Sequence, residues 1–147
     1  MHAPLPSEGG CYALVLRNSR PRKVSVGALG RVSIEPGYLV YVGSAFGPGG
    51  IRARVGRHLR TTKPLHWHID YLRRYLAIKE VWLTTAPESL EHAWAQRLVR
   101  DLEPAFPRFG ASDCRCGSHL FFSTGRPSAI LLGEPGISAA RVETWRP

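Results

Sequence analysis

One stretch of the sequence constrains the fold more than any other. Residues 37–45 form an apolar, aromatic run that ends abruptly at a glycine and two small residues, which predicts a buried strand. The glycine- and proline-rich segment 46–50 suits neither a strand nor a helix, so we expect a loop there. Residues 51–60 then predict a helix rich in basic side chains. This strand, loop and helix bring a phenol, backbone N–H groups and guanidinium groups to one place, an arrangement suited to binding phosphate.

The rest of the chain alternates between strand and helix patterns, which predicts an α/β (α+β) fold in a single domain spanning residues 1–147. We expect a small, mostly antiparallel central sheet flanked by helices, with an extra hairpin and C-terminal strands. Period-two patterns and turn signals predict strands at 11–17, 24–27, 31–35, 77–84, 119–123 and 129–132. Helical spacing and end signals predict helices at 66–75, 85–103 and 136–145, after a loose leader at 1–9.

The chain is strongly basic, with a formal net charge of +9 carried mostly by Arg. A small basic domain commonly has an anionic partner, most often nucleic acid, and a coding bias towards Arg is the alternative explanation. No apolar run approaches the ~18 residues needed to span a bilayer, so no membrane partner is expected. The three cysteines and the lack of a signal-peptide pattern favour reduced thiols in a cytoplasmic protein. The oligomeric state has no signature in the sequence.

Short motifs carry a resemblance to a known family. Gly10–Tyr12 and Tyr41–Gly43 occur in that order, followed by a helix with an arginine, the segment His66–Leu72 and the late segment Ser112–Leu120. Over residues 9–123 the chain resembles the GIY-YIG nuclease domain, and its details resemble the small Uri-type endonuclease-like branch. The resemblance implies a three-stranded antiparallel sheet flanked by helices. It also implies a metal-dependent endonuclease acting on duplex or branched DNA, with Mg²⁺ or Mn²⁺ as cofactor.

Two tyrosines are candidate catalytic residues. Tyr12 and Tyr41 fall on equivalent faces of neighbouring predicted strands, so both phenols can face one pocket. The pattern alone favours a pair of tyrosines at the edge of the core with hydrogen-bonded hydroxyls. The resemblance instead implies that Tyr12 acts as the base or orients the attacking water, with Tyr41 beside it.

Basic residues of the predicted helix supply further candidates. Arg54 and His58 lie one turn apart along one edge of its apolar stripe, and Arg52 flanks the other edge. Periodicity does not choose among the arginines, but the resemblance implies that Arg54 stabilises the phosphate and that His58 supports it. A solvated basic face is the alternative for the rest, which would contact the DNA backbone if DNA binds. The predicted nucleic-acid contacts are Gly43, Ser44, Arg52, Arg57, Arg60, Lys63, His66 and His68.

Glu91 is the predicted metal ligand. It opens a helical stripe, continued by Trp94 and Leu98, that is otherwise apolar. A carboxylate there is costly unless it is paired or binds a metal ion. Mg²⁺ prefers carboxylate and water oxygens, and the resemblance implies a single metal-binding glutamate on a helix in this region. An ion pair between Glu91 and an arginine is the alternative, whereas Glu88 is explained as a helix cap.

Two further segments hold residue types that bind metals. They contain His66, His68 and Asp70, and then Asp113, Cys114, Cys116 and His119. The spacing lacks the separated cysteine pairs of zinc knuckles, so zinc is not expected and both segments are interpreted as additional substrate or structural elements. The leading hypothesis is thus a metal-dependent DNA endonuclease. The alternatives are a catalytically inactive nucleic-acid-binding module of the same fold and a structural protein held together by zinc.

Overall fold

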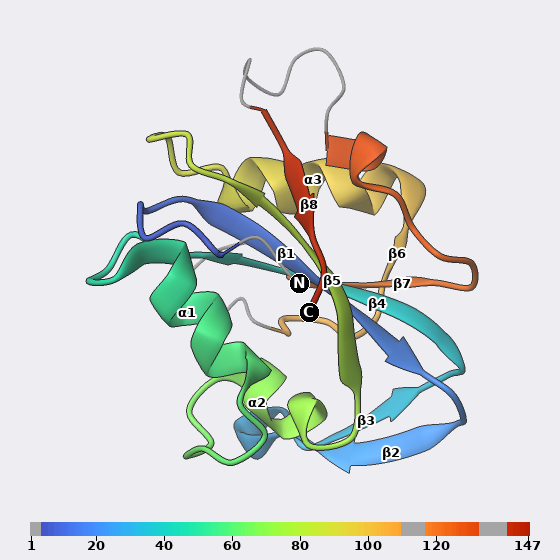
Figure 1. Ribbon diagram of the computed structural model, residues 1–147. Coiled ribbons are helices and arrows are strands. Elements are labelled where there is room, and N and C mark those ends of the chain that lie inside the picture. Colours follow the sequence, from blue (N-terminus) through green and yellow to red (C-terminus); the bar gives the residue numbers. More distant parts are fainter. Residues whose placement is uncertain (1–3, 110–116, 133–140) are drawn as a thin grey trace.

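The computed structural model of the chain describes residues 4–109, 117–132 and 141–147. A six-stranded sheet with the order β6-β7-β4-β1-β5-β8 crosses the molecule, and β2 and β3 form a separate hairpin (Figure 1). Neighbouring strands are antiparallel, which confirms the predicted α/β class. The strands are β1 (Cys11–Asn18), β2 (Arg22–Ser25), β3 (Arg31–Ile34), β4 (Gly37–Ser44), β5 (Ala77–Thr84), β6 (Glu103–Pro104), β7 (Leu120–Ser123) and β8 (Glu143–Trp145). The helices are α1 (Gly50–Leu59), α2 (His68–Arg73), α3 (Glu91–Asp101) and the short 3-10 helices η1 (Gly27–Leu29) and η2 (Ala129–Leu132).

The centre of the sheet consists of β4, β1 and β5, with β1 between the other two. Alternate residues of β4 pack on opposite faces, with Leu39 and Tyr41 on one face and Val40 and Val42 on the other. Tyr12 of β1 lies on the same face as Tyr41. The predicted buried strand at 37–45 and the predicted placement of both tyrosines on one face are therefore confirmed.

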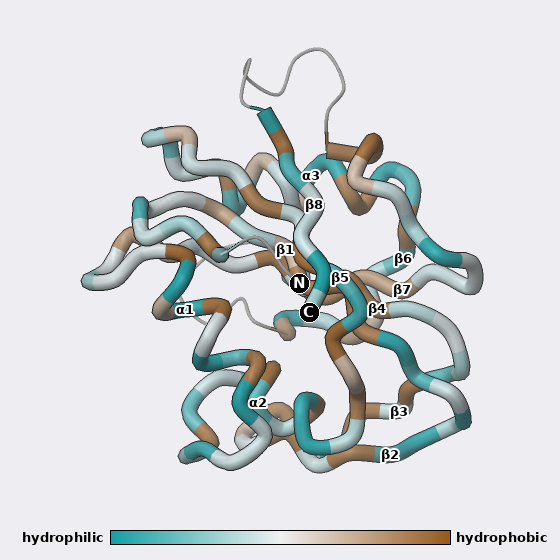
Figure 2. Tube along the Cα trace, in the orientation of Figure 1, coloured by the Kyte–Doolittle hydropathy of each residue, from teal (hydrophilic) through white to brown (hydrophobic). Residues whose placement is uncertain are grey.

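Helices cover both faces of the sheet (Figure 1). On the face that carries the two tyrosines, α1, α2 and the hairpin pack against the strands, with Ile51 and Leu72 fully buried. On the opposite face, α3 contributes Trp94 and Leu98 to a second hydrophobic cluster. Figure 2 shows hydrophobic residues recurring along the central strands and alternating with hydrophilic residues along α1. Burial on both faces explains why β4 and most of β1 are apolar instead of alternating with polar residues.

Two predicted C-terminal elements are wrong. Residues 129–132 form the 3-10 helix η2 instead of a strand, because they pack against α3, where Arg97 Nε donates to the carbonyl of Leu131 at 3.1 Å. Residues 143–145 form strand β8 instead of the end of a helix, because the outer edge of β5 offers them backbone hydrogen bonds. The earlier part of that predicted helix, 136–140, lies outside the described residues.

The helix α3 begins at Glu91 and not at residue 85, where the capping pattern predicts its start. The backbone N–H of Leu90 donates to the buried sulfur of Cys11 at 3.2 Å, which holds the chain just before the helix. Glu88 lies before the helix, so its predicted capping role is wrong. At 11 residues α3 is the longest described helix, and none of the described helices is long and apolar enough to cross a bilayer.

Residues 4–9 pack against the domain and do not form the predicted loose leader, whose residues 1–3 lie outside the described residues. Leu5 is buried in the core. The carbonyls of Pro6 and Glu8 accept hydrogen bonds from the N–H groups of Arg52 and Ile51, which begin α1. These N–H groups were expected to bind phosphate, and their occupation by the leader corrects that expectation. The candidate phosphate-binding groups on this helix are therefore its side chains.

Candidate functional site

A hydrogen bond between Tyr12 and His58 lies at the centre of the candidate site. Tyr12 is the second residue of β1, His58 lies in the last turn of α1, and 2.7 Å separates Tyr12 Oη from His58 Nε2. Both side chains are buried. Tyr41 of β4 packs edge-on against the His58 ring, with 6.1 Å between the ring centroids. The fold thus brings together three of the predicted catalytic residues.

Gly43 makes room for this pair. It lies directly opposite Tyr12 in the ladder between β1 and β4. A Cβ atom on residue 43 would overlap the Tyr12 hydroxyl, so any larger residue would displace the phenol. A glycine is therefore required at this position of β4 for a steric reason, which the sequence around it does not reveal.

Burial sets the protonation states of the three rings. Burial raises the pKa of Tyr12 well above its ordinary value, the neighbouring Tyr41 adds to this rise, and Arg54 opposes it. Burial also raises the pKa of Tyr41, as does the negative charge of Glu91. The pKa of His58 falls to about 3, because burial disfavours the charged imidazolium. At neutral pH both phenols are therefore protonated and the imidazole is neutral.

We expect the free energy of unfolding to fall as the pH drops from about 6.5 towards about 3. The unfolded chain binds a proton on His58 near the ordinary pKa of 6.5, whereas the folded protein binds it only at a pKa of about 3. The depressed pKa therefore contributes stability that is fully present above the unfolded value and is lost on acidification. The loss amounts to at most about 1.4 kcal/mol per pH unit. Urea unfolding across this pH window measures the slope.

The variant His58→Phe isolates this contribution, because it keeps a ring in the core and removes the titrating group. Its stability should be lower at neutral pH, since the Tyr12 hydroxyl loses its partner, but should depend less on pH within the window. His66→Gln is the matched control, because His66 is exposed and its loss should leave the slope unchanged. Equal slopes for wild type and His58→Phe would contradict a buried neutral imidazole.

Arg54 is fixed beside the tyrosine–histidine pair by contacts on two sides. Its Nη1 donates to the carbonyl oxygen of Ser44 at 3.2 Å. Its guanidinium carbon lies 4.4 Å from the centre of the Trp67 ring, a stacking contact that orients the guanidinium plane. The charge of Arg54 and a hydrogen bond from it both lower the pKa of Tyr12 against the effect of burial. Arg54 is therefore close enough to stabilise negative charge that develops next to the Tyr12 hydroxyl.

Arg57 is held in a largely buried salt bridge and is not the solvated DNA contact that the sequence predicts. Its Nη1 and Nη2 donate to the two carboxylate oxygens of Asp70 at 2.8 and 3.0 Å. Its guanidinium carbon also lies 4.3 Å from the centre of the Trp67 ring. The Arg57 side chain is 18% exposed and that of Asp70 is 0% exposed, so removal of either partner would leave a buried charge unpaired. Arg57 thus fixes the segment that carries Trp67, and Trp67 in turn positions Arg54.

Asp70 is the anchor of this arrangement. Burial alone would raise the pKa of its carboxyl group, but hydrogen bonds from Arg57 and from the backbone N–H groups of Trp67 and His66 lower that pKa below its ordinary value. The carboxylate therefore remains ionised and keeps the start of α2 tied to α1. The sequence analysis grouped Asp70 with His66 and His68 as metal-binding residue types, but in the structure its carboxylate forms a salt bridge with Arg57.

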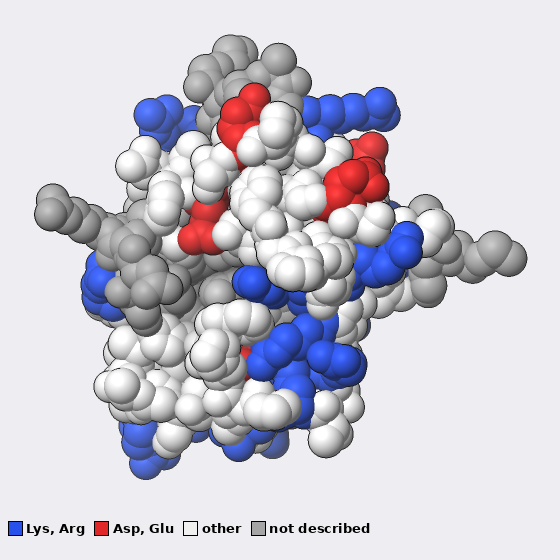
Figure 3. Space-filling model, turned by 90° about the vertical axis from the view of Figure 1, so that its left-hand side faces the viewer, with Lys and Arg blue, Asp and Glu red and all other residues white. Residues whose placement is uncertain are grey.

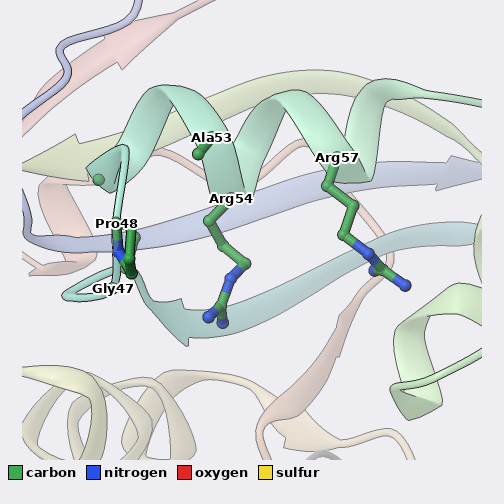
Figure 4. A pocket seen from close by; sticks show the side chains of 7 residues that line it. Gly47, Pro48, Ala53, Arg54 and Arg57 are labelled. Carbon is green, nitrogen blue, oxygen red and sulfur yellow. The ribbon is translucent and has the colours of Figure 1, made fainter.

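A pocket opens beside the two arginines. It has a volume of about 110 Å³ and is lined by Arg54, Arg57 and residues of the loop before α1. Figure 4 shows both guanidinium groups extending from the same side of α1, with Gly47 and Pro48 at the other end. On the side of the molecule where α1 lies, Lys and Arg side chains gather into a patch (Figure 3). The charge and the hollow together suit a negatively charged ligand.

The other predicted nucleic-acid contacts differ in their surroundings. Arg60 and His66 are exposed, and Arg52 is exposed although its Nε donates to the carbonyl of Leu5 at 2.8 Å. Lys63 donates through Nζ to the backbone carbonyls of His58 and Arg60 at the end of α1. Burial lowers the pKa of His68, which is partly enclosed. The exposed cations of this face are therefore the better candidates for contact with a polyanion.

Glu91, the predicted metal ligand, is the first residue of α3 and lies beside a histidine. Its Oε2 is 3.4 Å from His119 Nδ1, and its side chain is 21% exposed. Beside burial, its charge raises the pKa of both Tyr12 and Tyr41. Among the described residues, the side chain that its carboxylate contacts is His119 and not the arginine that the alternative interpretation predicts. Burial lowers the pKa of His119, so at neutral pH this contact joins a carboxylate to a neutral imidazole.

His92 completes a cluster that the sequence analysis missed. One ligand atom from each of Glu91, His92 and His119 lies within 4.8 Å of the others. Burial lowers the pKa of His119 and the charge of Glu91 opposes this. The sequence grouped His119 with Asp113, Cys114 and Cys116, which lie outside the described residues. The adjacency of a histidine to the predicted ligand was the signal that could have pointed to His92.

The donors of this cluster fit a divalent metal ion. A carboxylate oxygen is a ligand for Mg²⁺ and Mn²⁺, and imidazole nitrogens suit transition metals. His119 is buried and contacts the Glu91 carboxylate, whereas His92 is exposed. The cluster is therefore accessible to solvent on the side of His92. Glu91 and the two histidines are thus the residues that would hold an ion.

The fold and this site define the chain as a mixed α/β protein with a buried tyrosine–histidine pair beside a basic pocket. Residues 11–132 match the family described as Domain of unknown function DUF123, so the protein belongs to that family. The match extends from β1 to η2 and includes all the residues of the site. No curated protein and no solved structure matches the chain.

Proposed function

We propose that this protein is a metal-dependent endonuclease that hydrolyses phosphodiester bonds of DNA, in the manner of the GIY-YIG nucleases that its motifs resemble. The observation that carries the proposal is the hydrogen bond of 2.7 Å between Tyr12 and His58, beside a fixed Arg54. Phosphodiester hydrolysis needs a proton acceptor for water, charge stabilisation on the phosphate and a metal ligand. The reduced, buried thiol of Cys11 supports the proposal of a cytoplasmic location.

Tyr12 and His58 form a pair that can accept a proton from an attacking water. Burial keeps Tyr12 protonated at neutral pH, so its oxygen can take the water's proton only if its own proton leaves. His58 Nε2 lies within hydrogen-bonding distance, and a neutral imidazole has one unprotonated nitrogen. As the water oxygen bonds to phosphorus, the bond from phosphorus to the leaving sugar oxygen breaks, and that oxygen takes a proton from solvent. The water's proton moves to Tyr12, and the phenol proton moves to His58 Nε2 in the tautomer that carries its own proton on Nδ1. Burial lowers the pKa of His58 to about 3, and the charge of Asp70 opposes this and favours the imidazolium that forms.

Arg54 stabilises the negative charge that develops on the phosphate oxygens. Its planar guanidinium is oriented by Trp67 and the carbonyl of Ser44, so the group does not have to reorganise when the charge appears. Glu91, with its histidine neighbours, would hold a divalent ion such as Mn²⁺, or Mg²⁺ through the carboxylate alone. The bound ion would supply Lewis-acid stabilisation of a phosphoryl oxygen. The basic patch on this side of the molecule draws the DNA backbone to the pocket.

A cleavage assay tests the proposed function. The full chain is incubated with plasmid, branched and single-stranded DNA in the presence of Mg²⁺ or Mn²⁺, and with a chelator as the reference. We expect cleavage that depends on the ion and is abolished by Glu91→Gln, which removes a charge and almost no volume. Glu88→Gln is the matched control, because Glu88 is exposed and lies before α3. Undiminished cleavage by Glu91→Gln would refute the assignment of the carboxylate.

A nucleic-acid-binding module without catalytic activity is the alternative from another class of protein. The exposed Arg52 and Arg60 and the basic patch support it as well as they support the nuclease. The buried pair of Tyr12 and His58 favours the enzyme, because binding of a backbone does not require a phenol in contact with a buried imidazole. Tight DNA binding by a protein that cuts none of the substrates would decide for the module.

The affinity for duplex DNA should fall steeply with salt concentration. Each phosphate neutralised by an arginine releases condensed cations, which gives a log–log slope of about −0.9 per phosphate. Replacing the exposed Arg60 with Ala should make the slope shallower by about one unit, with little sequence preference. Fluorescence anisotropy of a labelled duplex, with Ca²⁺ present to prevent cleavage, measures the slope.

Arg100→Ala is the matched control for charge. Arg100 is also exposed, but it belongs to α3 on the opposite face of the sheet, so its removal should leave the slope unchanged. An affinity that does not change with salt would mean that the basic patch is not a binding surface.

Arg57→Ala should lower the free energy of unfolding by about 3–5 kcal/mol, because Asp70 is left buried without its partner.

A further inference from the structure

We propose that Glu91, His92 and His119 form a binding site for a first-row transition-metal dication, such as Mn²⁺, Co²⁺ or Zn²⁺, that is selective against Mg²⁺. The binding of the ion follows from the side chains alone. Only its use in DNA cleavage rests on the proposed function. The family resemblance implies an ion held by one glutamate and water. In the present proposal the ion is held by the Glu91 carboxylate and by the imidazoles of His92 and His119.

The backbone supports the three side chains from two elements. Glu91 and His92 are the first two residues of α3, and His119 immediately precedes β7. His119 is fixed by its own backbone, because its N–H donates to the carbonyl of Phe109 at 2.7 Å and its carbonyl accepts from Val42 at 3.0 Å. These two backbone hydrogen bonds fix the position of His119, so the side chains of Glu91 and His92 on α3 would adjust around an ion.

The distances within the cluster fit metal coordination after small side-chain rotations. Metal bonds to imidazole nitrogen and carboxylate oxygen are about 2.0–2.2 Å long, so neighbouring ligand atoms around one ion lie about 3–4 Å apart. Glu91 Oε2 and His119 Nδ1 already meet this condition at 3.4 Å. All three ligand atoms lie within 4.8 Å of one another, and the rings of His92 and His119 have centroids 5.7 Å apart. Rotation of the exposed His92 side chain closes the remaining gap.

The burial of the three residues gives the site an inner and an outer side. His119 is 1% exposed, Glu91 is partly exposed and His92 is exposed. An ion held by these three residues would therefore keep coordination positions directed towards solvent, which water or a phosphate oxygen can occupy. The described residues supply three ligands to the cluster, one fewer than the four protein ligands of a closed structural zinc site.

The donor set decides the class of ion. Mg²⁺ demands oxygen ligands in a near-octahedral arrangement and rarely takes imidazole. Two imidazoles and one carboxylate suit Mn²⁺, Fe²⁺, Co²⁺ and Zn²⁺, and the affinity of such a set rises from Mn²⁺ towards the later metals. A simple ion pair between Glu91 and His119 is the competing explanation. It accounts for the distance of 3.4 Å but requires nothing of His92.

Titration of the full-length protein with Co²⁺ tests the proposal, because bound Co²⁺ has visible absorption bands that report its ligands. Competition with Zn²⁺, Mn²⁺ and Mg²⁺ then ranks the ions. We expect Co²⁺ to bind at least about 100-fold more tightly than Mg²⁺. We expect His92→Gln to weaken Co²⁺ binding at least about tenfold. Unchanged Co²⁺ affinity in His92→Gln, or equal affinities for Co²⁺ and Mg²⁺, would overturn the proposal.

Three further variants make the result specific. His119→Gln and Glu91→Gln should also weaken Co²⁺ binding, and thermal melting shows whether the buried His119 variant still folds. His66→Gln is the matched control, because His66 is exposed and outside the cluster, and it should bind Co²⁺ like wild type. Replacing Cys114 and Cys116 together with Ser should also leave Co²⁺ binding intact. Loss of binding in this cysteine variant, with retention in His92→Gln, would assign the ion to the cysteines and refute the proposal.

The metal site and the proposed function can fail separately. Co²⁺ binding that requires His92, in a protein that cuts no DNA, would leave the metal site standing and refute the nuclease. DNA cleavage that is lost in Glu91→Gln, together with a Co²⁺ affinity that is unchanged in His92→Gln and His119→Gln, would leave the nuclease standing and refute the three-residue site.

Discussion

Replacing Tyr12 with Phe should lower the single-turnover rate of DNA cleavage by about 10²–10⁴-fold, the scale for loss of a general base. The substitution keeps the aromatic ring that fills the core and removes the hydroxyl that lies 2.7 Å from His58 Nε2. With no phenol oxygen, the attacking water has no route for its proton to the buried imidazole. The affinity for DNA, followed with Ca²⁺ in place of the catalytic ion, should change little.

Tyr38→Phe is the matched control for this substitution. Tyr38 belongs to the same strand as Tyr41 but packs on the opposite face of the sheet, against the cluster that includes α3. Its loss should leave the cleavage rate unchanged. Thermal melting of both variants shows whether either substitution alters the fold. A Tyr12→Phe protein that cuts DNA as fast as wild type would remove the tyrosine–histidine pair from the mechanism.

Replacing Arg54 with Ala should lower kcat by about 10²–10³-fold, the scale for loss of one preorganised charge stabiliser. Arg54 is fixed by Ser44 and by stacking on Trp67 before the substrate arrives, so its contribution is made to the charge that appears in the transition state. Lysine at this position should rescue little, because a compact ammonium can neither stack in the same way nor contact two oxygens at once. Single-turnover cleavage and DNA affinity, measured on the same variants, separate the two effects.

Arg60→Ala is the comparison that makes this result informative. Arg60 is exposed at the end of the same helix and should serve binding in the ground state. Its removal should weaken DNA affinity and leave the rate of the bound complex unchanged. If Arg54→Ala and Arg60→Ala had the same effect on both quantities, Arg54 would be one more backbone contact and the idea of a preorganised catalytic arginine would fail.

Local pattern was a good guide to single elements of this fold. The apolar run at 37–45 predicted β4, and the alternation of its side chains predicted that Tyr41 would share a face with Tyr12. The helix predicted at 51–60 is α1, which runs from Gly50 to Leu59. These predictions held because the period of hydrophobic residues records which side of an element is buried, and that information is local.

Element ends were predicted less well where a distant contact sets them. The capping pattern at residue 85 was overridden by the hydrogen bond from Leu90 to the sulfur of Cys11, so α3 starts at Glu91. The last strand, β8, forms because the edge of β5 is available to it, which no local propensity records. In both cases the deciding partner lies far away in the sequence.

The sequence by itself determined the class of fold and the strand and helix that carry Tyr41 and Arg54, and it singled out Glu91 as the carboxylate that opens the apolar stripe of α3. Tertiary structure alone decided which side chains meet. It forms the hydrogen bond between Tyr12 and His58, which are 46 residues apart, and the salt bridge between Arg57 and Asp70. It also brings Glu91 next to His119 and His92. The physical reason is that burial follows from the hydrophobic period of each segment, whereas hydrogen bonds, ion pairs and pKa shifts depend on how separate elements pack. Arg54 and Arg57 lie one turn apart on the same helix, and only the position of the segment around α2 pairs Arg57 with Asp70 while Arg54 stacks on Trp67 beside the tyrosines.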